Sequence, residues 1–254
     1  MDFNKENIQW IKGSHDLPEC IYKIHVPSVS EILSSVSDPE LEAFIEGVGK
    51  DKADEIMKQA ADRGKSMHIF IQQFISEYSK NKDISEALRY TQEQSPKMLD
   101  DAGIPGNKIE EGRDLFYKFY YSDYSNQYLD VLGIELAIYS PLYFYRGKLD
   151  ILYKNKLFGL SITDFKSSNG KIKKGSAKEY KMKLQLGAYS LCIKNMYQEK
   201  GITVNYASIL CIDKQNDILQ EIVLSGAELT DYENKFIELV KEYHIKHEQE
   251  YLIK

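Results

Sequence analysis

The chain has 254 residues, of which 43% are hydrophobic and 28% charged, and its formal net charge is −6. This balance is typical of a globular protein with a sizeable core and argues against a disordered or fibrous chain. No uninterrupted apolar run approaches the ~20 residues that a membrane helix needs. The three cysteines, Cys20, Cys192 and Cys211, are too sparse for a disulfide framework or a four-cysteine metal cluster.

The first residues, MDFNKE, have neither the basic start nor the apolar stretch of a secretory signal. We therefore expect a cytoplasmic protein without membrane contact, acting in the bacterial host cell if a phage encodes it. Residues 1–27 are expected to form an extended lead-in with few apolar contacts.

Helix signals follow this lead-in. In PSVSEIL, Ser28 and Glu31 are spaced as a capping box, and Asp38-Pro39 is a second helix start. Apolar residues then recur at helical spacing over about 51–78. This pattern predicts one long helix, or two helices joined near Gly64.

The next segment is less regular. Residues 81–106 are expected to form polar helical pieces that break at Pro96 and Pro105. Residues 108–130 then predict a helix that is dense in phenylalanine and tyrosine. Such a helix is more often part of a core than a platform on which bases stack, although stacking is available to it.

After Gly133 the apolar pattern changes from a helical to an alternating period, which is typical of strands. The expected elements are two strands within 134–153, a turn at 154–156, a third strand ending at 164–166, a helix over 178–198, a fourth strand over 203–212, a turn at 213–217, a fifth strand over 218–224 and a closing helix after Ser225. We expect one domain over 1–254, with a mainly helical part at 1–130 and an α/β part at 131–254.

The third strand raises a chemical question. In LSITDFKS, Leu160 and Ile162 share one face with Asp164 and Lys166, because strand side chains alternate. Asp150, on the preceding strand, can face Asp164 at the ~4.8 Å spacing of neighbouring strands, so the two carboxylates can share a divalent cation. A structural Asp164–Lys166 ion pair is the alternative, and the D-x-K triplet alone does not decide between them.

Further motifs accompany this pair: Gly147-x-x-Asp150, Gln185-Leu186-x-x-Tyr189 and Arg63-Gly64-x-x-x-His68. The first two motifs, together with ITDFKSS, resemble the RecB-like PD-(D/E)XK nucleases. The segments PSVSEIL and AADRGKSMHIFIQQFI resemble the mitochondrial genome maintenance exonuclease family and its phage-encoded relatives. The resemblance covers roughly residues 26–80 and 108–215 in the correct order. It implies a restriction-endonuclease-like α/β core, a mixed sheet flanked by helices, with a helical N-terminal part.

The resemblance also implies roles for individual residues. Asp150 and Asp164 would bind Mg²⁺ or Mn²⁺, with the Phe165 carbonyl and His68 as further ligands. Lys166 would orient or activate the attacking water. Gln185 and Tyr189, one helical turn apart, would steady the site, and Glu135 would be an acid on the first strand of the core. By composition alone, each has a simpler reading: His68 as a packed histidine, Glu135 as a surface acid, and Gln185 and Tyr189 as interface residues.

The implied function is a metal-dependent exonuclease that hydrolyses DNA, with a preference for single strands or ends, in replication, repair or recombination. The basic run Lys171, Lys173, Lys174 and Lys178 would follow the DNA backbone, or would simply be a solvated loop. Two alternatives stay open: a structure-specific endonuclease of the same fold, and a non-catalytic nucleic-acid-binding module. No phosphate-binding G-x-x-x-x-G-K-[ST] motif is present, so any helicase would be a separate chain.

Overall fold

The structure is a computed structural model that describes residues 26–128, 130–216 and 219–251, with side chains to residue 247. The predicted lead-in over 1–27, including Cys20, lies almost entirely outside these residues. Among the helices that are described, none is long and apolar enough to cross a lipid bilayer.

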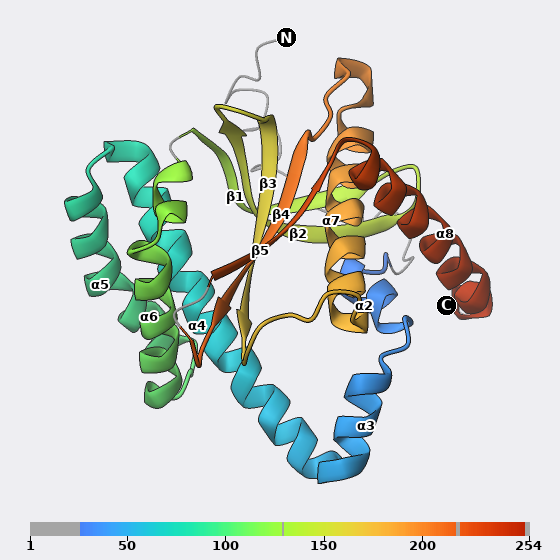
Figure 1. Ribbon diagram of the computed structural model, residues 1–254. Helices are drawn as coiled ribbons and strands as arrows, with labels where there is room; N and C mark the ends of the chain where they lie inside the picture. The colour runs from blue at the N-terminus through green and yellow to red at the C-terminus, as the bar shows by residue number, and fades with distance from the viewer. Residues whose placement is uncertain (1–25, 129, 217–218, 252–254) are drawn as a thin grey trace.

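Helices come first in the chain and strands follow (Figure 1). The helical part comprises α2 (Val29–Ser34), α3 (Pro39–Val48), α4 (Lys50–Asn81), α5 (Ile84–Asp101), α6 (Gly106–Tyr120) and the 3₁₀ turn η2 (Asp123–Gln127). The remainder comprises β1 (Val131–Ser140), β2 (Tyr145–Asn155), β3 (Gly159–Ser168), α7 (Ala177–Met196), η3 (Gln198–Lys200), β4 (Tyr206–Asp213), β5 (Leu219–Ser225) and α8 (Gly226–Tyr251).

The strands form one mixed five-stranded sheet in the order β1-β2-β3-β4-β5. Neighbouring strands are antiparallel except β3 and β4, which are parallel and joined through α7. A parallel pair needs such a crossover, whereas the antiparallel pairs are joined by short turns. The element order and the mixed sheet agree with the sequence prediction.

Helices cover both faces of the sheet, and each face has its own apolar cluster (Figure 1). On one side α7 and α8 pack against Ile162, Ile209 and Leu224. On the other side α4 and α6 pack against Ile151, Phe165 and Leu210, and α5 packs on α4. The sheet is therefore the middle layer between two helical layers, and residues on its two faces belong to different cores.

The N-terminal helix signals are confirmed. Ser28 Oγ accepts a hydrogen bond from the Glu31 N–H and the Glu31 carboxylate accepts one from the Ser28 N–H, which completes the capping box. Asp38 caps α3, with Pro39 at its first position. The long apolar pattern is a single helix, α4, that runs through Gly64 without a break.

The break predicted at Pro96 is wrong, because α5 continues through it. Proline lacks the N–H that would bond the carbonyl of Gln92, but Gln92 lies on the exposed side, where water can satisfy that carbonyl. The buried side of α5, with Ala87, Thr91 and Leu99, holds the helix against α4. Pro105, in contrast, does mark a boundary and precedes α6.

The predicted helix over 108–130 is too long, since α6 ends at Tyr120. The chain then turns so that Tyr128 is buried and its ring contacts Phe119, Tyr153 and Phe165. A helix to residue 130 would carry Tyr128 away from these partners. The aromatic residues of this segment are therefore mainly core residues, although Tyr121 is 78% exposed.

Candidate active site

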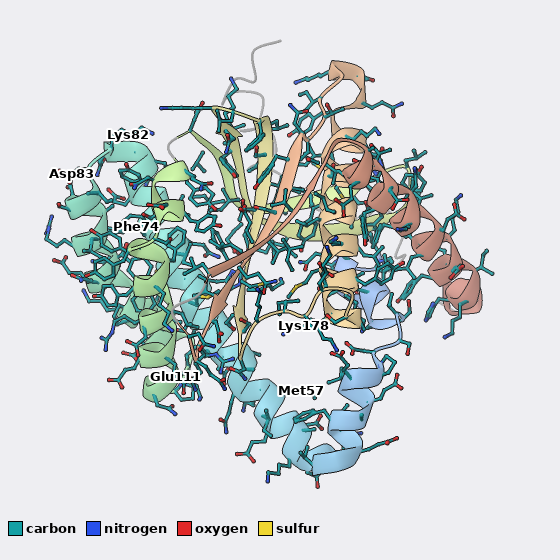
Figure 2. The ribbon with its side chains drawn as sticks, in the orientation of Figure 1. Met57, Phe74, Lys82, Asp83, Glu111 and Lys178 are labelled. Carbon is teal, nitrogen blue, oxygen red and sulfur yellow. The ribbon has the colours of Figure 1, made fainter. Side chains whose placement is uncertain are left out.

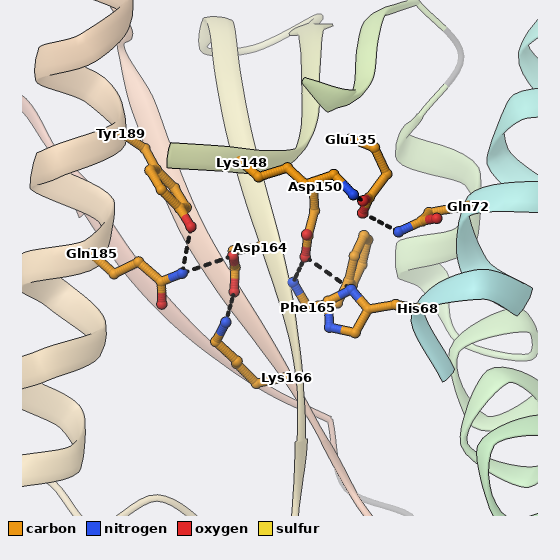
Figure 3. Close-up of polar contacts among 10 residues, drawn as sticks. All are labelled: His68, Gln72, Glu135, Lys148, Asp150, Asp164, Phe165, Lys166, Gln185 and Tyr189. Carbon is orange, nitrogen blue, oxygen red and sulfur yellow. Dashed lines mark hydrogen bonds and ion pairs between the residues drawn. The ribbon is translucent and has the colours of Figure 1, made fainter. Parts of the chain in front are cut away.

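The candidate site lies where β2 and β3 meet between α4 and α7 (Figure 3). The sheet supplies Glu135, Asp150, Asp164 and Lys166, while α4 supplies His68 and α7 supplies Gln185 and Tyr189. The β2–β3 register ends with Ile151 paired to Thr163, and Asp150 and Asp164 are the next residues of their strands. The Phe165 N–H of β3 donates to Asp150 Oδ2. The structure thus brings together all the polar side chains that the sequence singled out for catalysis or metal binding.

One cluster fits a metal ion. Ligand atoms of His68, Glu135 and Asp150 all lie within 4.8 Å of one another. His68 Nδ1 is 3.3 Å from Asp150 Oδ2, and the same oxygen accepts a 2.7 Å hydrogen bond from the Phe165 N–H. An imidazole with carboxylate oxygens is a donor set that Mn²⁺ accepts readily and that also offers Mg²⁺ its preferred oxygen ligands. These residues therefore fit a hard divalent cation.

The strands are irregular at this cluster. Leu149 and Ile151 are two residues apart on β2, yet they pack in the two different apolar clusters, and Leu136 and Ile134 do the same on β1. The reversal falls at Asp150 and at Glu135, whose backbone has a φ of +51°. A non-glycine residue rarely adopts this conformation, and such backbone is often found at functional sites.

Glu135 is held from two sides by residues that the sequence analysis did not identify. Gln72 Nε2 donates to Glu135 Oε1, and the Lys148 ammonium pairs with Glu135 Oε2 (Figure 3). Gln72 lies one helical turn after His68, and Lys148 lies two residues before Asp150. The helical spacing points to the same face of α4 as His68 and could have identified Gln72. For Lys148 no such signal holds, because the strand alternation is interrupted at Asp150.

Asp164 belongs to a second polar group. Its Oδ2 is 2.6 Å from Lys166 Nζ, and its Oδ1 accepts a 3.1 Å hydrogen bond from Gln185 Nε2. Gln185 Nε2 also donates to the Tyr189 hydroxyl at 2.8 Å. Gln185 and Tyr189 therefore connect α7 to the carboxylate, as their spacing predicts. The carbonyl of Phe165 as a ligand stays a prediction.

Burial controls the charges of this group. Desolvation raises the pKa of Asp164 to about 6, with the attraction of Lys166 opposing the shift and the charge of Asp150 adding to it. Burial alone would lower the pKa of Lys166, but the carboxylates of Asp164 and Asp150 outweigh it and raise that pKa above its ordinary value. Lys166 is therefore an ammonium at neutral pH.

Gly147 of the G-x-x-D motif has a packing role. A Cβ at this position would lie 2.9 Å from the Tyr189 ring, which is closer than real Cβ atoms approach other atoms. The absence of a side chain at Gly147 thus allows the buried Tyr189 ring to pack against β2, the strand that also carries Asp150.

The basic run lies between β3 and the first turn of α7. Lys171, Lys173, Lys174 and Lys178 are all exposed, and Lys178 is labelled in Figure 2. The loop that carries the first three has a defined shape, because Gln220 exchanges two hydrogen bonds with the backbone of the buried Ile172. Its role in DNA binding stays a prediction.

The raised pKa of Asp164 predicts how the metal-free protein responds to pH. Below the ordinary carboxyl pKa of 3.8 the residue is protonated in both the folded and the unfolded chain. As the pH rises toward 6, the unfolded chain ionises first, so Asp164 lowers the free energy of unfolding until its ionisation in the folded state is complete. In a chelating buffer, Asp164→Asn should therefore melt a few degrees above wild type at about pH 8 and close to it at about pH 4. A melting-temperature difference that stays constant with pH would contradict the assigned burial cost.

Acids and a lysine come together on neighbouring strands of a mixed sheet that lies between helices. The family model described as the PD-(D/E)XK nuclease superfamily matches residues 41–251, and the chain belongs to this superfamily. Nucleases of this superfamily use divalent metal ions, which agrees with the His68, Glu135 and Asp150 cluster.

Two other comparisons add little to this assignment. A crystal structure from Eubacterium rectale, described as a candidate exonuclease, is similar with 14% identity and a TM-score of 0.40, and the match covers 68% of each chain. Among curated proteins, no sequence matches this chain.

Proposed function

We propose that the protein is a metal-dependent exonuclease that hydrolyses phosphodiester bonds of DNA, with a preference for single strands or ends. The observation that carries the proposal is that two polar groups lie next to each other on the neighbouring strands β2 and β3. The first is the candidate cation cluster of His68, Glu135 and Asp150, and the second is the Asp164–Lys166 ion pair of β3.

The cation and the lysine have complementary roles. Mg²⁺ or Mn²⁺ held by His68, Glu135, Asp150 and Asp164 would lower the pKa of a water molecule and neutralise charge on the phosphate. Lys166 is an ammonium and would stabilise the negative charge that develops on the phosphate oxygens. Gln185 and Tyr189 would keep Asp164 oriented, since they hold its Oδ1 from α7.

The substrate proposal has its own support. The exposed lysines 171, 173, 174 and 178 follow directly after the strand that carries Asp164 and Lys166, so they can bind the backbone of DNA whose phosphate lies in the site. The preference for ends is inferred from the similarity of the N-terminal segments to exonucleases.

Digestion of labelled single strands tests the proposal. We expect linear strands to be degraded in Mn²⁺ or Mg²⁺, a chelator to stop the reaction, and circular single strands to stay intact. Strands labelled at the 5′ or the 3′ end would give the polarity. Cutting of the circle would instead show an endonuclease, and no cleavage in either metal would favour a binding module.

A further inference from the structure

A pocket of about 340 Å³ lies beside the candidate site and has no role in the chemistry described above. Its lining includes Arg146 and Lys148 of β2, the Tyr189 ring and the serines at positions 28 and 30. Among the described residues that line it, two are cationic and none is a carboxylate. A pocket with this lining favours an anion, and the anion of a nuclease substrate is a phosphate.

Lys148 connects this pocket to the cation cluster. Its side chain is 64% exposed and pairs with Glu135, which is 27% exposed and contributes to the cluster. Lys148 thus neutralises a carboxylate that the cation would use. A divalent cation at this carboxylate would repel the ammonium a few ångströms away, and its long, exposed stem leaves it free to turn.

We infer that Lys148 exchanges partners during the reaction: it leaves Glu135 when a cation binds, and it then binds a phosphate of the DNA in the adjacent pocket. This inference rests on the proposed function for its substrate. It makes Lys148 a second lysine of the site, beside Lys166, and it couples cation binding to DNA binding.

The inference predicts opposite effects of one substitution. Lys148→Ala removes a competitor for Glu135, so the affinity for Mn²⁺ without DNA should rise about two- to fivefold. The same change removes a phosphate contact, so DNA affinity in Mn²⁺ should fall, and the slope of log K against log salt should decrease by about 0.7. Mn²⁺ binding is measured by calorimetry. DNA binding is measured by anisotropy of a fluorescein-labelled single strand in a Lys166→Ala background, in which cleavage is blocked.

Two further variants control the test. Lys156→Ala removes the same charge in the turn after β2, eight residues further along the chain and roughly 25 Å away, and should change neither quantity. Lys148→Arg keeps the charge and should restore both values toward wild type. Melting temperatures should be unchanged, because Lys148 is mostly exposed.

The inference is overturned if Lys148→Ala leaves either affinity unchanged, or if it weakens Mn²⁺ binding. The latter result would make Lys148 a support for Glu135. Both measurements are of binding, so they can be made even if the wild-type protein does not cut DNA. Absence of cleavage would contradict the proposed function, whereas the two affinities of Lys148→Ala decide whether Lys148 exchanges partners.

Discussion

Replacing Lys166 with alanine should reduce cleavage by about a thousandfold or more, and Asp164→Asn should do the same. Lys166 is 33% exposed and lies at the end of a strand, so little packing depends on it. Its loss removes the ammonium that, in the proposed reaction, stabilises the negative charge of the phosphate. The effect should appear in kcat, measured on linear single strands at saturating Mn²⁺.

Folding and charge need separate controls in this experiment. Lys156→Ala, which removes an exposed lysine from the turn after β2, should cleave at the wild-type rate. Lys166→Ala leaves the buried Asp164 without its ammonium partner, so its melting temperature should fall by a few degrees. The folded variant should still bind Mn²⁺ through His68, Glu135 and Asp150. Wild-type-like cleavage by Lys166→Ala or Asp164→Asn would show that the reaction takes place elsewhere.

His68→Ala should raise the Mn²⁺ concentration needed for half-maximal cleavage by about tenfold or more. His68 offers a nitrogen to the cluster, and its Nδ1 lies 3.3 Å from Asp150 Oδ2. The measurement is the cleavage rate as a function of Mn²⁺ concentration for wild type and His68→Ala.

A packed histidine would give the opposite result. The His68 ring has an edge contact with Phe165, so its loss could lower the melting temperature while the folded protein keeps its Mn²⁺ dependence. Gln72→Ala is the matched control, since Gln72 lies one turn further on the same face of α4 and contacts Glu135 without contributing to the cluster. Its effect on the Mn²⁺ dependence should be smaller than that of His68→Ala.

The sequence predicted those parts of the site that depend on local spacing. Asp164 and Lys166 share a strand face, and Gln185 and Tyr189 share a helix face, because these geometries follow directly from the strand and helix periods. The capping box at Ser28 is confirmed for the same reason.

The sequence could not predict the reversal of strand faces at Glu135 and Asp150. Regular alternation would place Leu149 and Ile151 on one face, whereas they pack on opposite faces of the sheet. Only the positive φ of Glu135 in the folded backbone reveals the irregularity. The ion pair between Lys148 and Glu135 depends on it, which explains why no pattern identified Lys148.

The sequence also could not predict where α5 and α6 end, because tertiary packing determines these ends. Burial of Ala87 and Leu99 outweighs the cost of Pro96 in α5, and burial of Tyr128 ends the helical pattern early after α6. Local propensity is a weak guide where a side chain has such packing partners.

A cation bound in the cluster would also affect stability, because its ligands come from two different layers of the fold. His68 belongs to the helical layer of α4, whereas Glu135 and Asp150 belong to the sheet. An ion bound to all three would be a reversible cross-link between these layers, and its binding free energy would oppose any partial opening that moves α4 away from the strands. Depletion of divalent ions would therefore loosen the contact between α4 and the sheet as well as stop catalysis, and proteases would then reach the helical layer more readily.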